Sequence, residues 1–223
     1  MRTLTVFFSY MCFLAAAPVS ALDNPCDMDY VSVDGASVLI EPTGDDDTSN
    51  IQCALDSAAV QGITSVKLSS GSFYISQLFT ENYVGEFSGK SIAATSLIAQ
   101  DSGIACEEDD ISRAPGIITF AGGNVSVKTM SVEVDRPCSE GLVYRLLHFT
   151  QASCSARTYF STVDRLEITN RASLLDNVAT AISVTGNPDC VSSGKGPLGT
   201  AKVNRTELNT FYVGFESDLL GAA

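Results

Sequence analysis

Short apolar runs separated by Gly, Ser and Asn fill the sequence beyond residue 65, and they limit what the chain can fold into more than any other feature. None of them keeps a helical period over a useful length, whereas short apolar runs bounded by turn-forming residues are typical of β-strands. The runs are Val66–Leu68, Phe73–Ile75, Ser96–Ala99, Ile117–Phe120, Val125–Val134, Leu166–Thr169, Ala181–Val184 and Phe211–Phe215. We therefore predict an all-β domain of many short strands.

One segment differs from the rest and predicts a single helix, at residues 49–61. Its apolar side chains fall on one helical face: Ile51, Ala54, Leu55, Ala58 and Ala59. Ser49 and Gln52 have the spacing of a capping box, and Asp47 is the alternative N-cap residue. Gly62 ends the segment, as glycine commonly does at a helix C-terminus.

The longest run, Val125–Val134, changes the face to which its apolar residues point. Val125 and Val127 occupy odd positions, whereas the apolar residues from Met130 to Val134 occupy even ones. Because side chains alternate along a strand, this change predicts a corner or bulge within it.

A weak internal repeat links three segments of the second half. Val125–Val132, Val163–Asn170 and Ala201–Leu208 align with an offset of 38 residues at each step (163 − 125 and 201 − 163). Strands repeated at a fixed long period are typical of a solenoid. The identity between the segments is slight, so a chance match is the alternative.

The first 21 residues have the pattern of a removable export signal. Arg2 supplies a positive start, Thr3–Ala17 is almost uncharged and mainly apolar, and small residues at Pro18–Ala21 form a cleavage site. The apolar stretch is too short to span a bilayer comfortably, and no later segment approaches the required length, so a signal anchor is the less favoured alternative. We expect cleavage near Ala21, a secreted or periplasmic protein, and no membrane span in the mature chain.

Charge and length narrow the classes of partner and the domain organisation. The formal net charge is −13, which becomes −14 once Arg2 leaves with the signal. Binding to phosphate backbones depends on Lys and Arg, so we expect no nucleic-acid partner. Residues 22–42 read as an extended lead-in, and residues 43–223 are long enough for a β domain with a substantial core.

Six cysteines lie outside the signal, and an even number indicates disulfides in an exported chain. They are Cys26, Cys53, Cys106, Cys138, Cys154 and Cys190. No two have CxxC spacing and the chain has a single His, which argues against a zinc-type metal site. The residues alone leave the connectivity open.

Three segments of the first half resemble a known superfamily. Gly44–Ala58 joins an acidic turn to Ile-Gln-x-Ala-Leu, Val66–Ile75 matches Val-x-Leu-x-x-Gly-x-Tyr/Phe, and Val84–Ile98 contains a strand similar to Gly-x-x-x-Thr-x-Ile. Together they resemble the opening segment of the pectate-lyase-like (pectin lyase-like) superfamily, closely over residues 40–100 and only in style beyond. The resemblance implies a right-handed parallel β-helix (a solenoid) with one N-terminal capping α-helix.

The implied fold also suggests how the cysteines pair. Stacked coils bring residues one repeat apart to a strand spacing of about 4.8 Å, which is within disulfide reach. Two pairs, separated by 32 and 36 residues, are each close to one coil apart. A third pair ties the lead-in to the cap helix. The expected bonds are Cys106–Cys138, Cys154–Cys190 and Cys26–Cys53.

Most catalytic elements of the superfamily are missing. Of the polygalacturonase-like elements, Asn187–Gly194 holds only fragments of Asn-Thr-Asp and Asp-Asp, His148 has no neighbouring Gly, and Arg-x-Lys does not occur. The pectate-lyase element Arg-x-Pro-x-x-Arg begins at Arg113–Pro115, but Ile118 stands at its second Arg. Arg113 is therefore the single catalytic candidate, as the base of a lyase, and an ordinary loop Arg is the commoner alternative.

Other residues offer ligand or modification sites. Asp45–Asp47 and Glu107–Asp110 could supply oxygens to calcium, and the alternatives are a helix N-terminus and a solvated loop. We assign no other cofactor and no metal ligand. Asn124 and Asn204 each begin a glycosylation sequon. Five tyrosines could stack on sugar rings or simply belong to strands: Tyr74, Tyr83, Tyr144, Tyr159 and Tyr212.

The C-terminus has no polar cap. Phe211–Phe215 predicts a strand and Leu219–Ala223 is apolar, so a solenoid that ends there exposes its last coil. Either the chain is a fragment of a longer protein, which we favour, or a partner covers this end.

The leading functional hypothesis, which rests on the resemblance, is an exported polysaccharide-interacting module without an identifiable catalytic set. The first alternative is a divergent or truncated polysaccharide lyase or glycoside hydrolase, although the missing elements weigh against catalysis by this chain. The second is a non-catalytic structural or adhesive surface protein. An acidic polysaccharide suits so acidic a chain only if calcium bridges the charges. The sequence indicates no oligomeric state.

Overall fold

The computed structural model describes residues 26, 29–100, 107–108, 116–135, 142–153, 159–171, 177–186, 199–209 and 213–218. Within them the protein is mostly β-sheet, with one helix, α1 (Thr48–Gln61). The predicted all-β class is confirmed at that level. Residues 1–21, predicted to be the export signal, and the apolar end at 219–223 lie outside the described residues.

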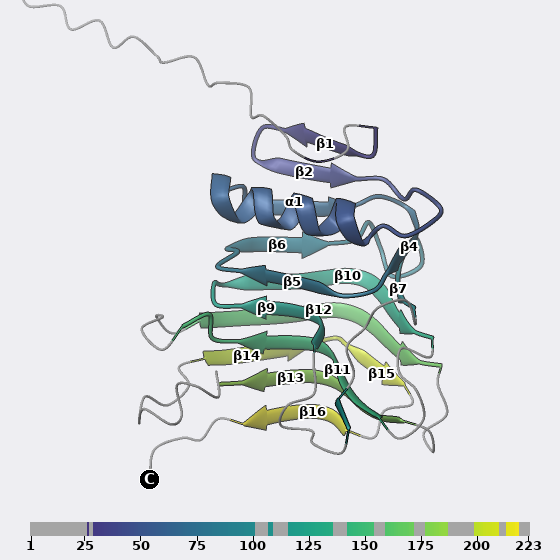
Figure 1. The fold of residues 1–223 in the computed structure, drawn as a ribbon, viewed down its shortest axis with the longest axis vertical. Coiled ribbons are helices and arrows are strands. Elements are labelled where there is room, and N and C mark those ends of the chain that lie inside the picture. Colours follow the sequence, from purple (N-terminus) through teal and green to yellow (C-terminus); the bar gives the residue numbers. More distant parts are fainter. Residues whose placement is uncertain are drawn as a thin grey trace, which may run out of the picture.

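The strands form two sheets, and in Figure 1 the strands of both lie across the view and follow one another along the long axis. Sheet A contains β1 (Val31–Asp34), β2 (Ser37–Ile40), β3 (Ser65–Leu68), β4 (Gly71–Ile75), β6 (Gly85–Ser88), β7 (Thr95–Ala99), β10 (Val125–Val134), β12 (Tyr159–Asn170), β14 (Gly199–Asn204) and β15 (Glu207–Asn209). Sheet B contains β5 (Leu78–Glu81), β8 (Glu107–Glu108), β9 (Gly116–Ala121), β11 (Leu142–Thr150), β13 (Asn177–Thr185) and β16 (Val213–Asp218). All eight apolar runs of the sequence overlap these strands.

From β9 onward the chain alternates between the two sheets, except that β14 and β15 follow each other in sheet A, and long strands of successive turns pair in parallel. Thus β10, β12 and β14 are successive neighbours in sheet A, and β9, β11, β13 and β16 are successive neighbours in sheet B. Only β1 with β2 and β8 with β11 pair antiparallel among the described strands. The β1–β2 hairpin turns at Gly35, whose φ of 57° favours glycine, and it lies within the predicted lead-in.

The repeat of the sequence aligns the correct strands but in the wrong register. Val127 pairs with Val163 and Val163 with Val203, so the offsets are 36 and 40 rather than 38 twice. Each error is two residues, which preserves the side-chain face because that face repeats every second residue. Parity of the apolar pattern therefore could not reveal the error.

The predicted corner in β10 is confirmed at Thr129, which has φ 56°. Val127 lies before it and Met130 after it, and both side chains are buried despite their opposite parity. Arg165 (φ 55°) and Arg205 (φ 45°) occupy the equivalent places in the next two layers of sheet A. Left-handed backbone in three successive layers bends the whole sheet along one line.

Helix α1 begins one residue earlier than predicted and has Asp47 at its N-cap, the alternative considered above. The capping box is wrong, because the Gln52 side chain bonds to Asp56 in the same helix and to Phe79 of β5. Its Oε1 accepts from the Phe79 N–H at 2.9 Å and its Nε2 donates to the Phe79 carbonyl at 2.6 Å. Gly62 ends the helix in the left-handed conformation, as expected.

These two bonds place α1 over the open edge of sheet B. Strand β5 is the last strand of that sheet, and its contacts with α1 leave the helix directly above it (Figure 1). Gln52 supplies the donor and acceptor that a further strand would have offered to Phe79. In sheet A the corresponding end position is occupied by β1.

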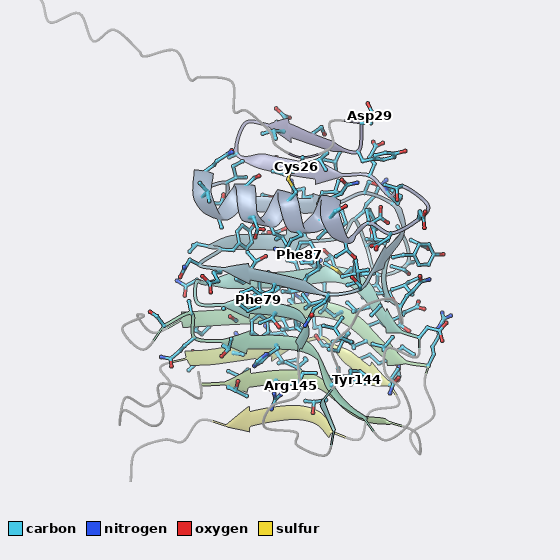
Figure 2. All side chains as sticks on the ribbon, viewed as in Figure 1. Cys26, Asp29, Phe79, Phe87, Tyr144 and Arg145 are labelled. Atoms are coloured by element: carbon cyan, nitrogen blue, oxygen red, sulfur yellow. A yellow bond between two sulfur atoms is a disulfide. The ribbon has the colours of Figure 1, made fainter. Side chains whose placement is uncertain are left out.

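A single apolar core fills the space between the sheets and the helix. Phe120 of β9 lies at its centre, with ring centroids 6.0 Å from Phe149, 6.1 Å from Phe87 and 6.5 Å from Tyr83. Phe87, labelled in Figure 2, is fully buried. Aromatic residues of three strands, β6, β9 and β11, and Tyr83 of the β5–β6 connection thus pack together in the core.

The Cys26–Cys53 disulfide is present, as predicted, and joins the lead-in to α1. Figure 2 shows Cys26 at the face of the helix that carries its partner. The predicted Cys106–Cys138 and Cys154–Cys190 bonds lie outside the described residues.

Candidate functional site

A groove of about 880 Å³ lies on the outer face of sheet A. It crosses the five neighbouring strands β2, β3, β6, β10 and β12, at the line where left-handed residues bend the sheet. At a spacing of about 4.8 Å between strands, five strands span about 19 Å. Its lining is mainly polar: Leu39, Glu41, Pro42, Lys67, Leu68, Ser69, Ser70, Glu86, Ser88, Gly89, Lys90, Lys128, Thr129 and Arg165.

The pairing register explains why these side chains meet. Leu39, Lys67, Ser88 and Lys128 are consecutive partners across β2, β3, β6 and β10. Each of them follows a buried apolar residue in its strand, as Lys67 follows Val66 and Lys128 follows Val127. Because the layers stack in parallel, residues far apart in sequence form one outward-facing ladder.

The groove gathers positive charge in an acidic protein. Four cations line it, Lys67, Lys90, Lys128 and Arg165, against two carboxylates, Glu41 and Glu86. The local balance is therefore 4 − 2 = +2, whereas the chain carries −13.

The cations differ in how far they are already neutralised. Lys128 pairs with Glu86 at 2.5 Å, and the two side chains are about one third exposed. Lys67 and Lys90 are exposed, and neither has a carboxylate within ion-pair distance in the part of the chain that the structure describes. These two ammonium groups are the ones available to an anionic ligand.

Lys128 also sets the ionisation of Glu86. Partial burial alone raises the pKa of this carboxyl, but hydrogen bonds from Lys128 and Ser88 and the charges of Lys128 and Lys67 outweigh it, so the pKa lies below its usual value. Glu86 is thus a carboxylate at neutral pH and is unsuited to donate a proton there.

Arg165, at the end of the groove, is held by Asp164. Its Nε donates to Asp164 Oδ2 at 3.1 Å, and Arg205 donates to both oxygens of the same carboxylate at 3.0 and 2.7 Å. Despite an opposing desolvation effect, these two guanidinium groups lower the pKa of Asp164. The shared carboxylate fixes Arg165 beside the groove in its left-handed backbone conformation.

The catalytic residues considered from the sequence do not meet at this groove. Arg113 and Asn187–Gly194 lie outside the described residues. His148 belongs to sheet B, where its Nε2 is 2.7 Å from Thr185 Oγ1. The structure therefore brings no sequence-predicted catalytic residue to the groove among those it describes.

The first acidic cluster serves the backbone around the N-terminus of α1. Asp47 is fully buried, with Oδ1 accepting from the Thr43 N–H at 2.8 Å and Oδ2 from the Tyr74 N–H at 3.1 Å. Asp46 Oδ1 accepts from the Thr48 N–H at 2.8 Å. No group of three or more His, Cys, Asp or Glu side chains that could hold a metal occurs among the described residues.

Among the residues that the structure describes, no tyrosine lines the groove, so these side chains offer little to a ligand bound there. Tyr83 and Tyr144 are fully buried, and burial raises the pKa of both phenols well above the usual value. Tyr83 donates to the Glu86 carbonyl at 2.7 Å. Tyr74 is half-buried on β4.

Sequence reasoning missed the groove because its other three cations are 23 to 98 residues from Lys67 in the chain. The available signal was parity, since Lys67 and Lys128 alternate with buried apolar neighbours. That signal shows that a side chain points outward, but not which layers stack.

Among the described residues, no helix has the length and apolar character needed to cross a bilayer. Comparison with known proteins identifies no relative: no protein-family model, curated protein or solved structure matches the chain.

Proposed function

We propose that the protein is an exported, right-handed parallel β-helix that binds an acidic polysaccharide in the groove of sheet A. The observation that carries the proposal is the cationic groove across five stacked strands. The alternating parallel sheets, the helix over β5 and the resemblance at residues 40–100 support the solenoid. The pattern of residues 1–21 and the Cys26–Cys53 bond support export.

The groove's shape favours a chain-like ligand. It runs across the strands for about 19 Å rather than closing around a small molecule. Ser69, Ser70, Ser88 and Thr129 are hydroxyl-bearing residues of its lining, and hydroxyl groups can both donate to and accept from sugar hydroxyls. An extended sugar polymer fits such a surface better than a compact ligand does.

The groove's charge favours a carboxylated or otherwise anionic polymer. Lys67 and Lys90 can pair with ligand anions without first breaking an ion pair with a described residue. This removes the need for calcium to bridge an acidic polymer to an acidic protein, because the local charge is opposite in sign to the net charge.

Binding without turnover is the form of this function that the groove supports. Glycoside hydrolysis requires one carboxylic acid that protonates the leaving group and a second carboxylate. Glu86 is held ionised by Lys128, and Glu41 is the other carboxyl in the lining. Among the described lining residues, Glu86 therefore cannot serve as the acid, and Glu41 is the one carboxyl left for that role.

The test is titration of the purified mature chain with polygalacturonate, an unbranched uronate polymer, by calorimetry in the presence of a chelator. The methyl-esterified polymer serves as the neutral comparison. We expect saturable binding of the acidic polymer, weakened by salt because exposed charges are screened, and no unsaturated or shortened products. The appearance of such products would show that the protein is an enzyme and not a binding module. The absence of any binding would reject the proposal.

A double variant locates the site. Lys67→Gln with Lys90→Gln removes two exposed cations, each worth about 0.5–1 kcal/mol, so affinity should fall about tenfold. Lys202→Gln is the matched control, because Lys202 is an exposed outward lysine on β14 of the same sheet but does not line the groove. Because the control removes one charge and the double variant two, a loss of binding free energy in Lys202→Gln of half that in the double variant would show that binding follows net charge and not the groove.

A further inference from the structure

One glycosylation sequon stands at an exposed place on sheet A. Asn124 immediately precedes β10 and is exposed, and Ser126 completes the sequon two residues later. Its side chain has the parity of Ser126 and Lys128, which lie on the outer face of the sheet. The acceptor is therefore on the surface and at a strand end, where added bulk displaces no core residue.

A hydrogen bond fixes which side-chain atom faces solvent. Asn124 Oδ1 accepts from the Phe160 N–H in the next layer at 2.7 Å. Because an N–H can only donate, the atom in that bond must be the oxygen. The amide nitrogen Nδ2, to which N-linked sugars attach, is left without a hydrogen-bond partner among the described residues.

Apolar side chains flank the same place and are uncovered. Phe160, which follows Asn124 in the stack, is 49% exposed, and Val84, beside Gly85 whose N–H bonds to the Asn124 carbonyl, is 53% exposed. Single exposed apolar side chains are common on protein surfaces, and these two leave a surface against which a sugar chain can pack. A sugar chain leaving from between them covers both.

The second sequon differs in each respect. Asn204 is half-buried on β14, where its strand partner is Asp164. The middle residue of its sequon, Arg205, is left-handed and binds Asp164, and the Thr206 hydroxyl donates to the Asn204 carbonyl at 2.9 Å. A glycan there would compete for space with the Asp164–Arg205 ion pair.

We infer that Asn124 is an N-glycosylation site and that Asn204 is not used. In the transfer, Nδ2 forms a bond to C1 of an oligosaccharide carried on a lipid diphosphate. The C1–O bond to the diphosphate breaks, the lipid diphosphate leaves with that electron pair, and Nδ2 loses one proton to a base of the transferase. The inference requires export but does not depend on the polysaccharide-binding proposal. Lys128 is four residues away, about 13 Å along the strand, so the glycan leaves the groove open.

The experiment is secretion of the full chain from a eukaryotic host that attaches N-linked oligosaccharides. A second version, with the host's own leader in place of residues 1–21, separates failure of export from failure of modification. Enzymatic removal of N-glycans converts the modified Asn to Asp, which peptide mass spectrometry locates. Asn124→Asp keeps an oxygen for the Phe160 N–H while removing the acceptor nitrogen, and Asn204→Asp is its matched control.

We expect modification at Asn124 alone, its loss in Asn124→Asp, and no change in Asn204→Asp. An unmodified Asn124 in the secreted chain overturns the inference, and so does a glycan on Asn204, whether alone or together with Asn124. We expect the Asn124→Asp protein to remain folded. Comparing its melting temperature with that of Asn204→Asp checks that the glycan was lost without loss of the fold.

Discussion

The seal between α1 and sheet B depends on Gln52, and Gln52→Ala tests it. The substitution removes both side-chain bonds to Phe79, to its N–H at 2.9 Å and to its carbonyl at 2.6 Å. The N–H and carbonyl of Phe79, at the edge of β5, would then depend on water for their hydrogen bonds in a place that the helix covers. The disulfide and the buried face of α1 remain, so the helix stays in place and only the seal is lost.

The expected loss follows from the two bonds to Phe79, because the third bond that the substitution removes, from Nε2 to Asp56 Oδ1 at 2.9 Å, is exposed to water. Each neutral hydrogen bond contributes about 0.5–1.5 kcal/mol, so together they contribute about 2 kcal/mol. For a chain of this size, 1 kcal/mol corresponds to about 2–4 °C in melting temperature, which predicts a decrease of about 4–8 °C. Alanine is also a better helix former than glutamine, and that gain offsets a few tenths of a kcal/mol.

Gln61→Ala corrects for the gain in helix propensity. Gln61 is in the same helix, is exposed, and makes no side-chain hydrogen bond to another described residue. Thermal denaturation followed by circular dichroism should show Gln52→Ala melting below both wild type and Gln61→Ala. Equal melting temperatures for the two variants would refute the role of Gln52 as a substitute strand.

Three further changes test other parts of the structure. Gly123→Ala should destabilise the protein far more than Gly44→Ala in denaturant titrations. Both glycines have left-handed backbone, but only at Gly123 would a Cβ lie 2.0 Å from a backbone atom, the carbonyl oxygen of Tyr83. Equal losses of stability in the two variants would contradict this contact. Replacing Cys26 and Cys53 together by Ser should cost about 3.5 kcal/mol by chain entropy for a separation of 27 residues, and an unchanged unfolding midpoint would contradict the tether. The pKa of Glu86 is lowered by folding, so its carboxylate stabilises the protein above its unfolded pKa, and this contribution disappears as pH falls through the folded value. Glu86→Gln should therefore melt below wild type at neutral pH and at the same temperature as wild type in strong acid. It should also bind polygalacturonate more tightly, because Lys128 is released from its ion pair. A difference in melting temperature that persists in acid would contradict the role of the ion pair.

The sequence reveals the strands and the helix because each depends on a local pattern. The change of parity in Val125–Val134 marks the left-handed corner at Thr129, and the acidic turn before residue 49 marks the start of α1. Register is a different matter, since a shift of two residues keeps every side chain on its face. The offsets of 36 and 40 could therefore not be distinguished from 38 by apolar pattern alone.

The candidate site could not be predicted from the sequence, because it also depends on the register of the strands. Lys67, Lys90, Lys128 and Arg165 are unremarkable surface residues until the register stacks their layers. Gln52 shows the converse error, in which a local capping signal was outweighed by a tertiary contact 27 residues away. Residues whose role depends on stacking are the ones that sequence reasoning misses.

The central claim, that an acidic polymer lies along the groove, is tested most directly by chemical coupling. A carbodiimide joins carboxylates of bound oligogalacturonate to lysine amines within contact distance, and peptide mass spectrometry identifies the modified lysines. We predict coupling at Lys67 and Lys90, with Lys202 unmodified although it is exposed on the same sheet. Coupling at Lys202 equal to that at Lys67 and Lys90, or none at the groove lysines under saturating ligand, would contradict the account.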